Sequence, residues 1–470
     1  MNKIFLTTTL PYANSVPHIG HALEFIQASA IKRFLTSRGD DVFLNVGIDE
    51  HGQKMFNAGG GNSGLDVMLH CDEMARVWTD FCFKFDIEFD RFYRTTSEEH
   101  KKNVAEFWNK LVRSGDIYMA PYEAVYCQGC ESFKTDTEIV DGKCPDHPTT
   151  ELTKVSEMNY FFALSKYVVN LLSNDKLLLF PKVKRTELQN LIADAKDVSI
   201  SRSSDKVSWG IKVPNDDTQT IYVWFEALLN YLFSQGERGW EESREIIQLC
   251  GPDNIRFQGV LWQAMLLAGK HRPTDYLLVH GTVLDGNGNK MSKSFGNVIS
   301  PMDLLDKHGL SSVRYYALKG LNTFENSSWD EQAQVRLYNS DLANNYGNLL
   351  ARTVHLMDLN SMTAPIGKIQ FGKYKVIDTA KIKYDDYMAE FQLRLALEQA
   401  MEMLSYGNTI MNSQRPWEAE STNKEEILRE LWWILSAATD MLSIALSAQD
   451  IAMVRKSLNE VKKIIVFPKK

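Results

Sequence analysis

The stretch KIFLTTTLPYANSVPHIGHALEFIQASAIKRFL, residues 3–35, carries the pattern from which we predict the fold. It begins with a strand-like apolar run over residues 3–10 and continues into apolar residues at helical spacing over about residues 20–37. DVFLNVG at 41–47 then predicts a second strand, and further helical pattern follows it. Strands that alternate with helices indicate an α/β domain with a parallel sheet.

The rest of the chain departs from this pattern twice. From Ile117 short strand-like pieces and turn formers predict an insertion, after which TIYVWFEALLNYL at 220–232 resumes the α/β pattern. Beyond Trp329 the periodicity is only helical, which predicts an α-helical bundle. We therefore expect an α/β domain in two halves, residues 1–116 and 214–300, with an insertion between them at 117–213. A linking region at 301–335 and a helical bundle at 336–470 would follow.

Composition limits the class of protein. The chain has 470 residues, which allows two to four domains, with 44% apolar and 24% charged residues, as in ordinary globular proteins. The N-terminus lacks a signal-peptide pattern and no apolar run approaches the roughly 20 residues of a membrane span, so we expect a cytoplasmic protein without membrane contact. A net charge of -8 argues against polyanion binding over the whole surface, although a local basic patch stays possible.

A cluster of cysteines predicts a metal site within the insertion. The pattern C-x2-C-x13-C-x2-H offers four ligands: Cys127, Cys130, Cys144 and His147. Two tight turns that each carry two such ligands suit tetrahedral Zn²⁺, and a full set of four protein ligands indicates a structural metal. The alternatives are chance clustering of reduced thiols and, less favoured in a cytosolic chain, a disulfide.

His18 and His21, in PHIGH, lie where the first strand gives way to the first helix. Their spacing is compatible with metal binding, but the cysteine cluster already supplies a complete set of ligands. A helix start offers free N–H groups to an anion, and Gly20 lets a ligand approach the backbone. We therefore favour phosphate binding, with a capping or packing role as the alternative.

A second stretch, GNGNKMSKSFGN at 286–297, places Lys290 and Lys293 in a loop rich in glycine and asparagine. Such lysines are cations that can close over a polyphosphate, although a solvated basic turn is the alternative for the loop alone. Together, PHIGH and KMSKS resemble the signature pair of class I aminoacyl-tRNA synthetases.

The likeness to the methionyl-tRNA synthetase family within this class runs through the chain. It includes TLPYAN at 9–14, VGIDEHGQK at 46–54, YVWFEALLNY at 222–231, VHG at 279–281 and NLLAR at 348–352. The resemblance implies a Rossmann-type catalytic domain split by a small zinc-binding insertion and followed by a helical anticodon-binding domain. It also implies methionine activation by ATP and transfer of methionine to tRNA(Met), initiator and elongator alike.

The resemblance also implies roles for particular residues. The catalytic and ATP-binding positions are His18, Gly20, His21, Lys290, Ser292 and Lys293, with Mg²⁺ accompanying ATP. The methionine-binding positions are Leu10, Tyr12, Asp49, Trp224, Ala227, Leu228, Tyr231 and His280. Asp49 would hold the substrate ammonium group, whereas the spacing of Trp224 and Tyr231 alone would suit ordinary core residues.

Three positions in the bundle match the family's anticodon contacts: Asn348, Arg352 and Trp417. Stacking and base-edge hydrogen bonds are the usual means of reading unpaired RNA bases, whereas outside the family Asn348 and Arg352 would be a plain solvated pair. The chain also departs from the family pattern at Thr9, Glu226 and Gln258, near the expected pocket.

We expect a monomer, because the chain ends after the bundle without the extra C-terminal domain that dimerises some relatives. The alternatives are another class I synthetase for an apolar amino acid, and a catalytically silent tRNA-binding paralogue.

Overall fold

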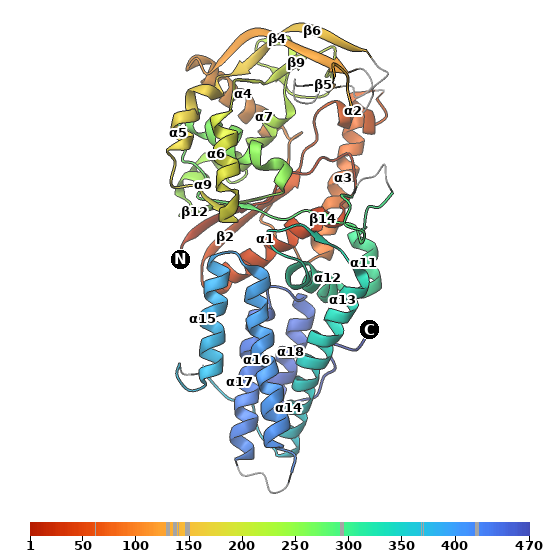
Figure 1. Ribbon diagram of the computed structural model, residues 1–470, viewed down its shortest axis with the longest axis vertical. Helices are drawn as coiled ribbons and strands as arrows, with labels where there is room; N and C mark the ends of the chain where they lie inside the picture. The colour runs from red at the N-terminus through yellow and green to blue at the C-terminus, as the bar shows by residue number, and fades with distance from the viewer. Residues whose placement is uncertain are drawn as a thin grey trace.

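A six-stranded parallel sheet forms the centre of the upper body of the molecule in Figure 1. The computed structural model describes residues 1–61, 63–127, 132–134, 139, 141–145, 151–291, 296–367, 369, 371–418 and 423–470. The order of the sheet is β3-β2-β1-β12-β13-β7. Its strands are β1 (Lys3–Thr7), β2 (Asp41–Ile48), β3 (Arg91–Arg94), β7 (Leu178–Phe180), β12 (Glu245–Cys250) and β13 (Tyr276–Val279). The predicted parallel sheet, split by an insertion between β3 and β12, is confirmed.

Both faces of this sheet are covered by apolar side chains. Ile4 and Leu6 of β1 belong to the core that includes α1 and α3, whereas Phe5 belongs to the core on the other face with α4 and α10. This alternation follows from the two-residue period of a strand, and burial on both faces explains the nearly continuous apolar run IFL. The surrounding helices are α1 (Ile19–Ser37), α2 (Gln53–Ala58), α3 (Gly64–Lys84), α4 (Glu98–Arg113), α5 (Val168–Leu172), α6 (Arg185–Ala193), α7 (Val223–Leu228), α8 (Asn230–Phe233), α9 (Gly236–Glu242) and α10 (Trp262–Ala268).

The strand order decides where a ligand can bind. The chain runs outward from β1 through β2 to β3, and later outward on the other side from β12 to β13. In open α/β sheets such a reversal leaves a crevice beyond the carboxyl ends of the central strands. The loops after β1, β2, β12 and β13 therefore meet at one place.

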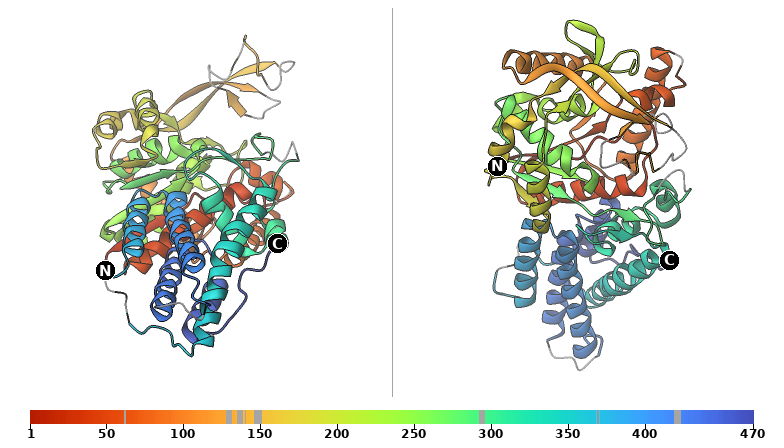
Figure 2. Two further views of the ribbon diagram at one scale, coloured as in Figure 1. Left: turned by 60° about the horizontal axis from the view of Figure 1, so that its bottom comes forward. Right: turned by 45° about the horizontal axis from the view of Figure 1, so that its top comes forward.

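The segment between β3 and β12 contains two smaller antiparallel sheets, β5-β4-β6-β8 and β10-β11-β9. The β4–β6 pair forms a long two-stranded ribbon that projects from the body (Figure 2). The strands are β4 (Ile117–Cys127), β5 (Ser132–Lys134), β6 (Leu152–Phe162), β8 (Val198–Ser199), β9 (Ser201–Ser203), β10 (Lys212–Val213) and β11 (Asp216–Ile221).

One strand within the predicted insertion range belongs elsewhere. Strand β7 lies inside residues 117–213, yet it pairs in parallel with β13, and Leu178 faces Tyr276 in the register. The range is therefore not a separate body, because it returns to the edge of the large sheet. The signal was weak because only three residues of the run pair with the neighbouring strand.

Helices alone make up the chain after β15 within the described residues, and this confirms the predicted helical C-terminal region. The strands β14 (Val283–Leu284) and β15 (Ser327–Ser328) pair ahead of the bundle. The bundle contains α13 (Glu331–Leu337), η8 (Tyr338–Gly347), α14 (Asn348–Leu359), α15 (Lys375–Ala389), α16 (Leu393–Gln414), α17 (Lys424–Leu442) and α18 (Ala448–Glu460). Between sheet and bundle lie α11 (Pro301–His308), α12 (Leu310–Tyr315) and η7 (Tyr316–Gly320).

Two arginines, on α1 and α12, link the bundle to the part of the chain that contains the parallel sheet. Arg33 of α1 donates to the carbonyl oxygens of Ser443 and Leu446, and the fully buried Arg314 donates to that of Ile444. Each also donates to the main chain at residues 85–86. Within the part of the chain that is described, no helix combines the length and the apolarity needed to cross a membrane.

Candidate active site

The first turn of α1 is closed by its own histidines. His18 is the N-cap residue, and its Nδ1 accepts from the main-chain N–H groups of Gly20 at 3.1 Å and His21 at 3.3 Å. The Nδ1 of His21 accepts in turn from the His18 N–H at 3.3 Å, and the two rings stack with centroids 3.6 Å apart. Because both Nδ1 atoms accept, a ring hydrogen of each histidine is on Nε2, and both residues line the pocket described next.

Gly20 is required by this arrangement. A Cβ atom at Gly20 would lie 2.9 Å from Cε1 and 3.1 Å from Nδ1 of His18. The His18 ring therefore folds over the helix start only because position 20 has no side chain. Glycine at position 20 was predicted because it lets a ligand approach the backbone; the space that it leaves for the His18 ring is a second reason for glycine there.

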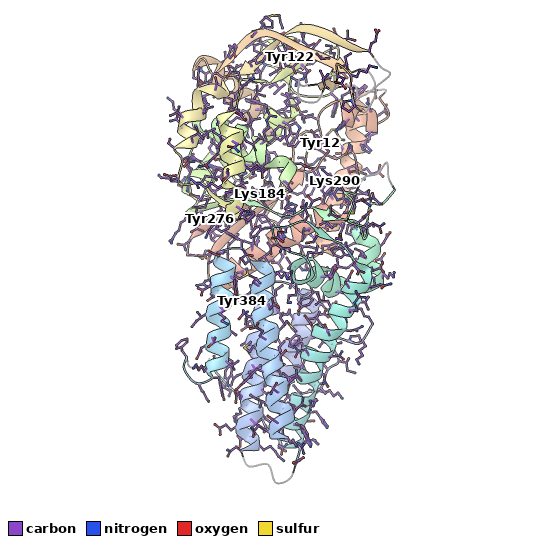
Figure 3. All side chains as sticks on the ribbon, in the orientation of Figure 1. Tyr12, Tyr122, Lys184, Tyr276, Lys290 and Tyr384 are labelled. Carbon is purple, nitrogen blue, oxygen red and sulfur yellow. The ribbon has the colours of Figure 1, made fainter. Side chains whose placement is uncertain are left out.

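A pocket of about 370 Å³ opens beside the helix start, at the carboxyl ends of the central strands. Within the described residues it brings together predicted ATP-binding and methionine-binding positions: Leu10, Tyr12, His18, Gly20, His21, Asp49, Trp224, Ala227, Leu228, Tyr231, His280 and Lys290. Figure 3 labels Tyr12 and Lys290, which both line it. Residues almost 280 positions apart thus share one wall, as the reversal of strand order requires.

Aromatic rings form one end of the pocket. The main chain of Tyr12 forms an isolated parallel β-bridge with that of Asp49. The Tyr12 ring packs edge-on against Trp224, with the two ring centroids 6.0 Å apart. Trp224 stacks flat on Phe257, with centroids 4.0 Å apart. Burial, and next the charge of Asp49, raises the pKa of Tyr12, so its hydroxyl remains protonated at neutral pH. Rings of this kind suit a flexible, polarisable apolar side chain.

The carboxyl group of Asp49 lies in an unusual environment. Asp49 is only 3% exposed, and burial followed by the charge of Glu226 raises its pKa well above the ordinary value. Its carboxylate accepts a long hydrogen bond from the His51 N–H at 3.4 Å, and a hydrogen bond from the Thr95 side chain also lowers the pKa, but burial outweighs both. A buried carboxyl group whose pKa stays raised despite these bonds gains from an entering cation.

Glu226, whose charge helps to raise the pKa of Asp49, is itself stabilised by two histidines. His51 donates through Nδ1 to one of its oxygens at 2.9 Å, and His100 donates through Nε2 to the other at 2.6 Å. Tyr93 then donates to Nδ1 of His100 at 3.1 Å. Burial alone raises the pKa of Glu226, but the two histidines outweigh burial and hold the pKa below its ordinary value. The Glu226 carboxylate, at a position where aspartate is commoner in the family, thus bridges both histidines.

Thr9, a second departure, fastens a buried acid that the sequence reasoning missed. The Thr9 N–H and hydroxyl donate to the same oxygen of Glu24, at 2.6 and 2.8 Å, and Nε2 of His280 donates to the other at 2.9 Å. Nδ1 of His280 lies 2.8 Å from the carbonyl oxygen of Gly281. Both ring nitrogens therefore face acceptors, which only the protonated ring satisfies. Burial lowers the pKa of His280, but the bond and charge of Glu24 outweigh it and leave the pKa raised.

Gln258, the third departure, lies in a wide helical turn, η5 (Phe257–Leu261), ahead of α10. Its Nε2 donates to the hydroxyl oxygen of Tyr231 at 2.6 Å. Wide turns of this kind are frequent at functional sites because they redirect one side chain out of the regular spacing. Here Gln258 lines the pocket, and Phe257 stacks on Trp224, which also lines it.

Lys290 lies at the mouth of the pocket. Its Nζ forms an exposed ion pair at 2.6 Å with Asp253, which follows β12 in the short helical turn η4 (Pro252–Asn254). Asp285 holds the base of the Lys290 loop, because its carboxylate accepts from the main-chain N–H groups of Asn287 and Asn289 and from the Asn297 side chain. Ser292 and Lys293, also predicted to bind ATP, lie outside the described residues.

Only part of the predicted zinc set can be placed. Cys127 is the last residue of β4, and Cys144 is fully buried, whereas Cys130 and His147 lie outside the described residues. The β4–β5 ladder pairs Cys127 with Ser132. Among the residues that are described, no three acidic, histidine or cysteine side chains gather as a metal site would require.

Of the predicted anticodon residues, Asn348 and Arg352 lie on α14, and Trp417 lies in the turn after α16, in the bundle that extends away from the sheet (Figure 1). The Arg352 guanidinium lies 5.1 Å from the centroid of the Trp417 ring and donates to Asn412 at 3.0 Å. Trp417 is 45% exposed, and Asn348 is exposed one turn before Arg352. The structure thus brings Arg352 and Trp417 together.

Glu24, Phe257 and Asp253 line or adjoin the pocket but were not predicted. Only Glu24 left a signal, since a carboxylate between Leu23 and Phe25 falls on the buried face of an apolar helix. Phe257 and Asp253 owe their positions to the wide turn and to the loop after β12, which no periodicity reveals.

Comparison with known proteins gives consistent matches. The family model described as class I tRNA synthetases (M) matches residues 4–157 and 149–354. The chain is 34% identical to a chloroplastic/mitochondrial methionine–tRNA ligase of Arabidopsis thaliana over 94% of this chain and 74% of the relative. It is likewise 34% identical to a methionine–tRNA ligase of Nostoc, over 94% of this chain and 86% of that one. Among solved structures, Mycobacterium tuberculosis methionyl-tRNA synthetase in complex with methionyl-adenylate aligns over 100% of both chains with a TM-score of 0.86 and 28% identity.

Proposed function

The chain belongs to the methionine–tRNA ligase family of class I aminoacyl-tRNA synthetases, and from this premise we propose which residues carry each step of the ATP-dependent reaction. In the first step the methionine carboxylate attacks the α-phosphorus of ATP, which gives methionyl adenylate and releases pyrophosphate. In the second, the terminal adenosine of tRNA(Met) attacks the acyl carbon through its 2′-hydroxyl, and AMP leaves. The observation that carries the proposal is that one pocket joins the aromatic cluster and Asp49 to the histidine-capped start of α1.

Methionine would lie at the aromatic end. Tyr12 and Trp224 hold its side chain, and Asp49 ionises to pair with its ammonium group. Leu10, Ala227 and Leu228 complete the apolar wall. His280, whose ring nitrogens both face protein acceptors, would act by holding Glu24 rather than by touching the substrate.

ATP would lie across the start of α1. The Nε2–H groups of His18 and His21 donate to oxygens of the α-phosphate as charge develops there, and the α1 N-terminus adds its own favourable field. Lys290, Lys293 and Ser292 would reach the leaving pyrophosphate. Mg²⁺, which accompanies ATP, would neutralise part of the charge on that pyrophosphate.

The decisive experiment is ATP–pyrophosphate exchange measured with each of the twenty amino acids. We expect methionine to support exchange at least about tenfold faster than any other, because a shaped apolar pocket discriminates by roughly that much or more. Exchange driven by leucine or valine would favour another class I specificity. The absence of exchange with every amino acid, in protein that still binds tRNA, would favour a silent paralogue.

The bundle would recognise the anticodon. An exposed tryptophan beside an arginine offers a stacking surface for an unpaired base, and Asn348 adds a base-edge donor and acceptor. We propose that initiator and elongator tRNA(Met) both bind here, since they would present the same anticodon. Asn348, Arg352 and Trp417 are then the contacts to test.

Zn²⁺ in the insertion stays a proposal that rests on the ligand spacing. The burial of Cys144 and the pairing of Cys127 with Ser132 are compatible with it, and a bound ion would hold the segment between β4 and β6 without taking part in the chemistry. Metal analysis of the purified chain should give one zinc per chain. We also propose a monomer that acts in the cytoplasm; the relatives include bacterial enzymes as well as an organellar one.

A further inference from the structure

A chain of four buried polar residues begins at Gln258, which lines the pocket, and leads away from it. Gln248, Gln258, Gln263 and Thr274 are each at most 1% exposed, and they come from β12, η5, α10 and the segment before β13. Hydrogen bonds join them in the order Gln263, Thr274, Gln248, Gln258, and the last reaches Tyr231. Buried polar groups are costly unless fully paired, so such a chain calls for a reason.

The direction of the hydrogen bonds is fixed at the inner end. The Thr274 main-chain N–H can only donate, and it lies 3.1 Å from Oε1 of Gln263. Nε2 of Gln263 therefore faces the other way and donates at 2.9 Å both to the carbonyl oxygen of Gln258 and to the Thr274 hydroxyl. Two main-chain groups, one donor and one acceptor, thus leave the Gln263 amide a single orientation.

This orientation propagates to the pocket. Because the Thr274 hydroxyl oxygen accepts from Gln263, its hydrogen is donated to Oε1 of Gln248. Nε2 of Gln248 then donates to Oε1 of Gln258 at 3.1 Å, and Nε2 of Gln258 donates to the Tyr231 oxygen at 2.6 Å. Each amide can be turned only one way without placing two donors or two acceptors face to face.

Tyr231 is the outer end of the chain. Its oxygen accepts from Gln258, and the amide of Asn230, whose own oxygen accepts from Asn45, is a second donor beside it. Burial raises the pKa of Tyr231, so the hydroxyl keeps its hydrogen. With donors on the protein side, that hydrogen is directed to the pocket that Tyr231 lines.

We propose that Gln263, Thr274, Gln248 and Gln258 are positioning residues that fix the direction in which the Tyr231 hydroxyl donates its hydrogen. This inference rests on the proposed methionine activation, in which that hydroxyl donates to the thioether sulfur of the substrate. A thioether sulfur is a weak acceptor, whereas the methylene of norleucine, which has nearly the same shape, accepts nothing. The relay thus makes the pocket favour a sulfur atom over a carbon atom at this position.

The test compares kcat/KM in ATP–pyrophosphate exchange for methionine and for norleucine. In the unmodified protein we expect a methionine preference of at least about fivefold, the value of one neutral hydrogen bond with a buried donor left unpaired in its absence. Tyr231→Phe should reduce the preference to near one, because the donor is gone. The ratio is informative since a merely structural defect lowers both substrates equally.

Gln258→Glu tests the relay itself. The introduced carboxyl group, once ionised, can only accept, so the Tyr231 hydrogen would turn toward it and away from the sulfur. The preference for methionine should therefore fall as the pH rises from 6 to 9. Asp49, Glu24 and His280 also face the pocket, and the pH profile of the unmodified protein supplies the baseline for their titration.

Gln399→Glu, in the buried face of α16 away from the pocket, is the matched control and should leave the preference unchanged. Thermal melting of each variant reports whether it folds; if Gln258→Glu fails to fold, Gln248→Met, which frees the Gln258 amide to turn over, should at least halve the preference. If Tyr231→Phe kept the full preference for methionine over norleucine, the inference would be overturned. It would also be overturned if the preference did not change with pH in a folded Gln258→Glu variant. No exchange with methionine in the unmodified protein would instead refute the proposed function.

Discussion

The pocket and the far part of the bundle represent two opposite ways to build a binding surface. In the pocket Asp49, Glu226 and Tyr231 are at most 3% exposed and are held by other protein groups before any ligand enters. In the bundle Trp417 is 45% exposed, and Arg352 is held by one ring contact and one hydrogen bond. Under the proposed function, methionine would meet a preorganised interior, whereas the tRNA anticodon would meet an open surface.

The difference follows from what each ligand offers. A single amino acid has few groups to contact, so discrimination requires polar groups that are already desolvated and oriented, and burying them costs stability. An RNA loop brings stacking faces and many phosphates, so exposed contacts suffice. Changes in the pocket should therefore affect exchange and tRNA charging together, and changes in the bundle should affect charging alone.

The largest effect should come from Asp49→Asn. If Asp49 pairs with the substrate ammonium group as proposed, losing its carboxylate should raise the KM for methionine in exchange by about 100-fold or more, as for other buried charge pairs broken on one side. Charging should fall in parallel. Steady-state exchange and aminoacylation on the same preparation measure both.

The same variant, Asp49→Asn, should increase the stability of the fold although it weakens methionine binding. Because burial and Glu226 raise the pKa of Asp49, its folding contribution is most favourable below the ordinary aspartate pKa of about 4 and is lost as the pH rises through the folded value. Asp49→Asn should thus raise the melting temperature, and more so at pH 8 than at pH 5. Asp80→Asn, in an exposed pair with Lys84, is the control. A lower melting temperature with unchanged KM would make Asp49 a structural residue.

An intermediate effect is expected from Trp417→Ala and Arg352→Gln. Removing one stacking surface should reduce kcat/KM for charging by roughly 10- to 100-fold, the value of one base stack. Exchange should be unchanged within about twofold, since neither residue approaches the pocket. Arg429→Gln, which breaks an exposed pair with Glu425 on α17, provides a matched loss of charge. Equal losses in exchange and charging would show that the two surfaces are not separate.

Periodicity predicted the start of α1 but not the irregular turns of the site, and residues outside helices and strands, such as Tyr12, His280 and Lys290, were assigned from the family resemblance. PHIGH stands at a strand-to-helix junction, so His18, Gly20 and His21 could be placed by periodicity and capping chemistry. Phe257 could not, because a wide turn shifts it off the helical spacing, and β7 could not, because three residues are too few to register as a strand.

The three departures from the family pattern show the same limit. Thr9, Glu226 and Gln258 were visible in the sequence, but their partners Glu24, His51, His100 and Gln248 lie 10 to 175 residues away. Side-chain pairing over such separations is a property of the folded chain. The anticodon surface is the opposite case, since its assignment came from family resemblance and the structure adds only the Arg352–Trp417 contact.

The smallest effect on activity is expected at the mouth of the pocket, where the side chains are neither fully buried nor part of the open bundle surface. Lys290 and Asp253 form an ion pair in which both side chains are more than half exposed. Exposed pairs contribute about 0.2–1 kcal/mol, so Asp253→Asn should release Lys290 for ATP and lower the KM for ATP by less than about fivefold. The effect should shrink in high salt, because screening already weakens the pair. A rise in the KM for ATP would mean that Asp253 contacts the nucleotide itself, and the preorganised surface would then extend to the mouth.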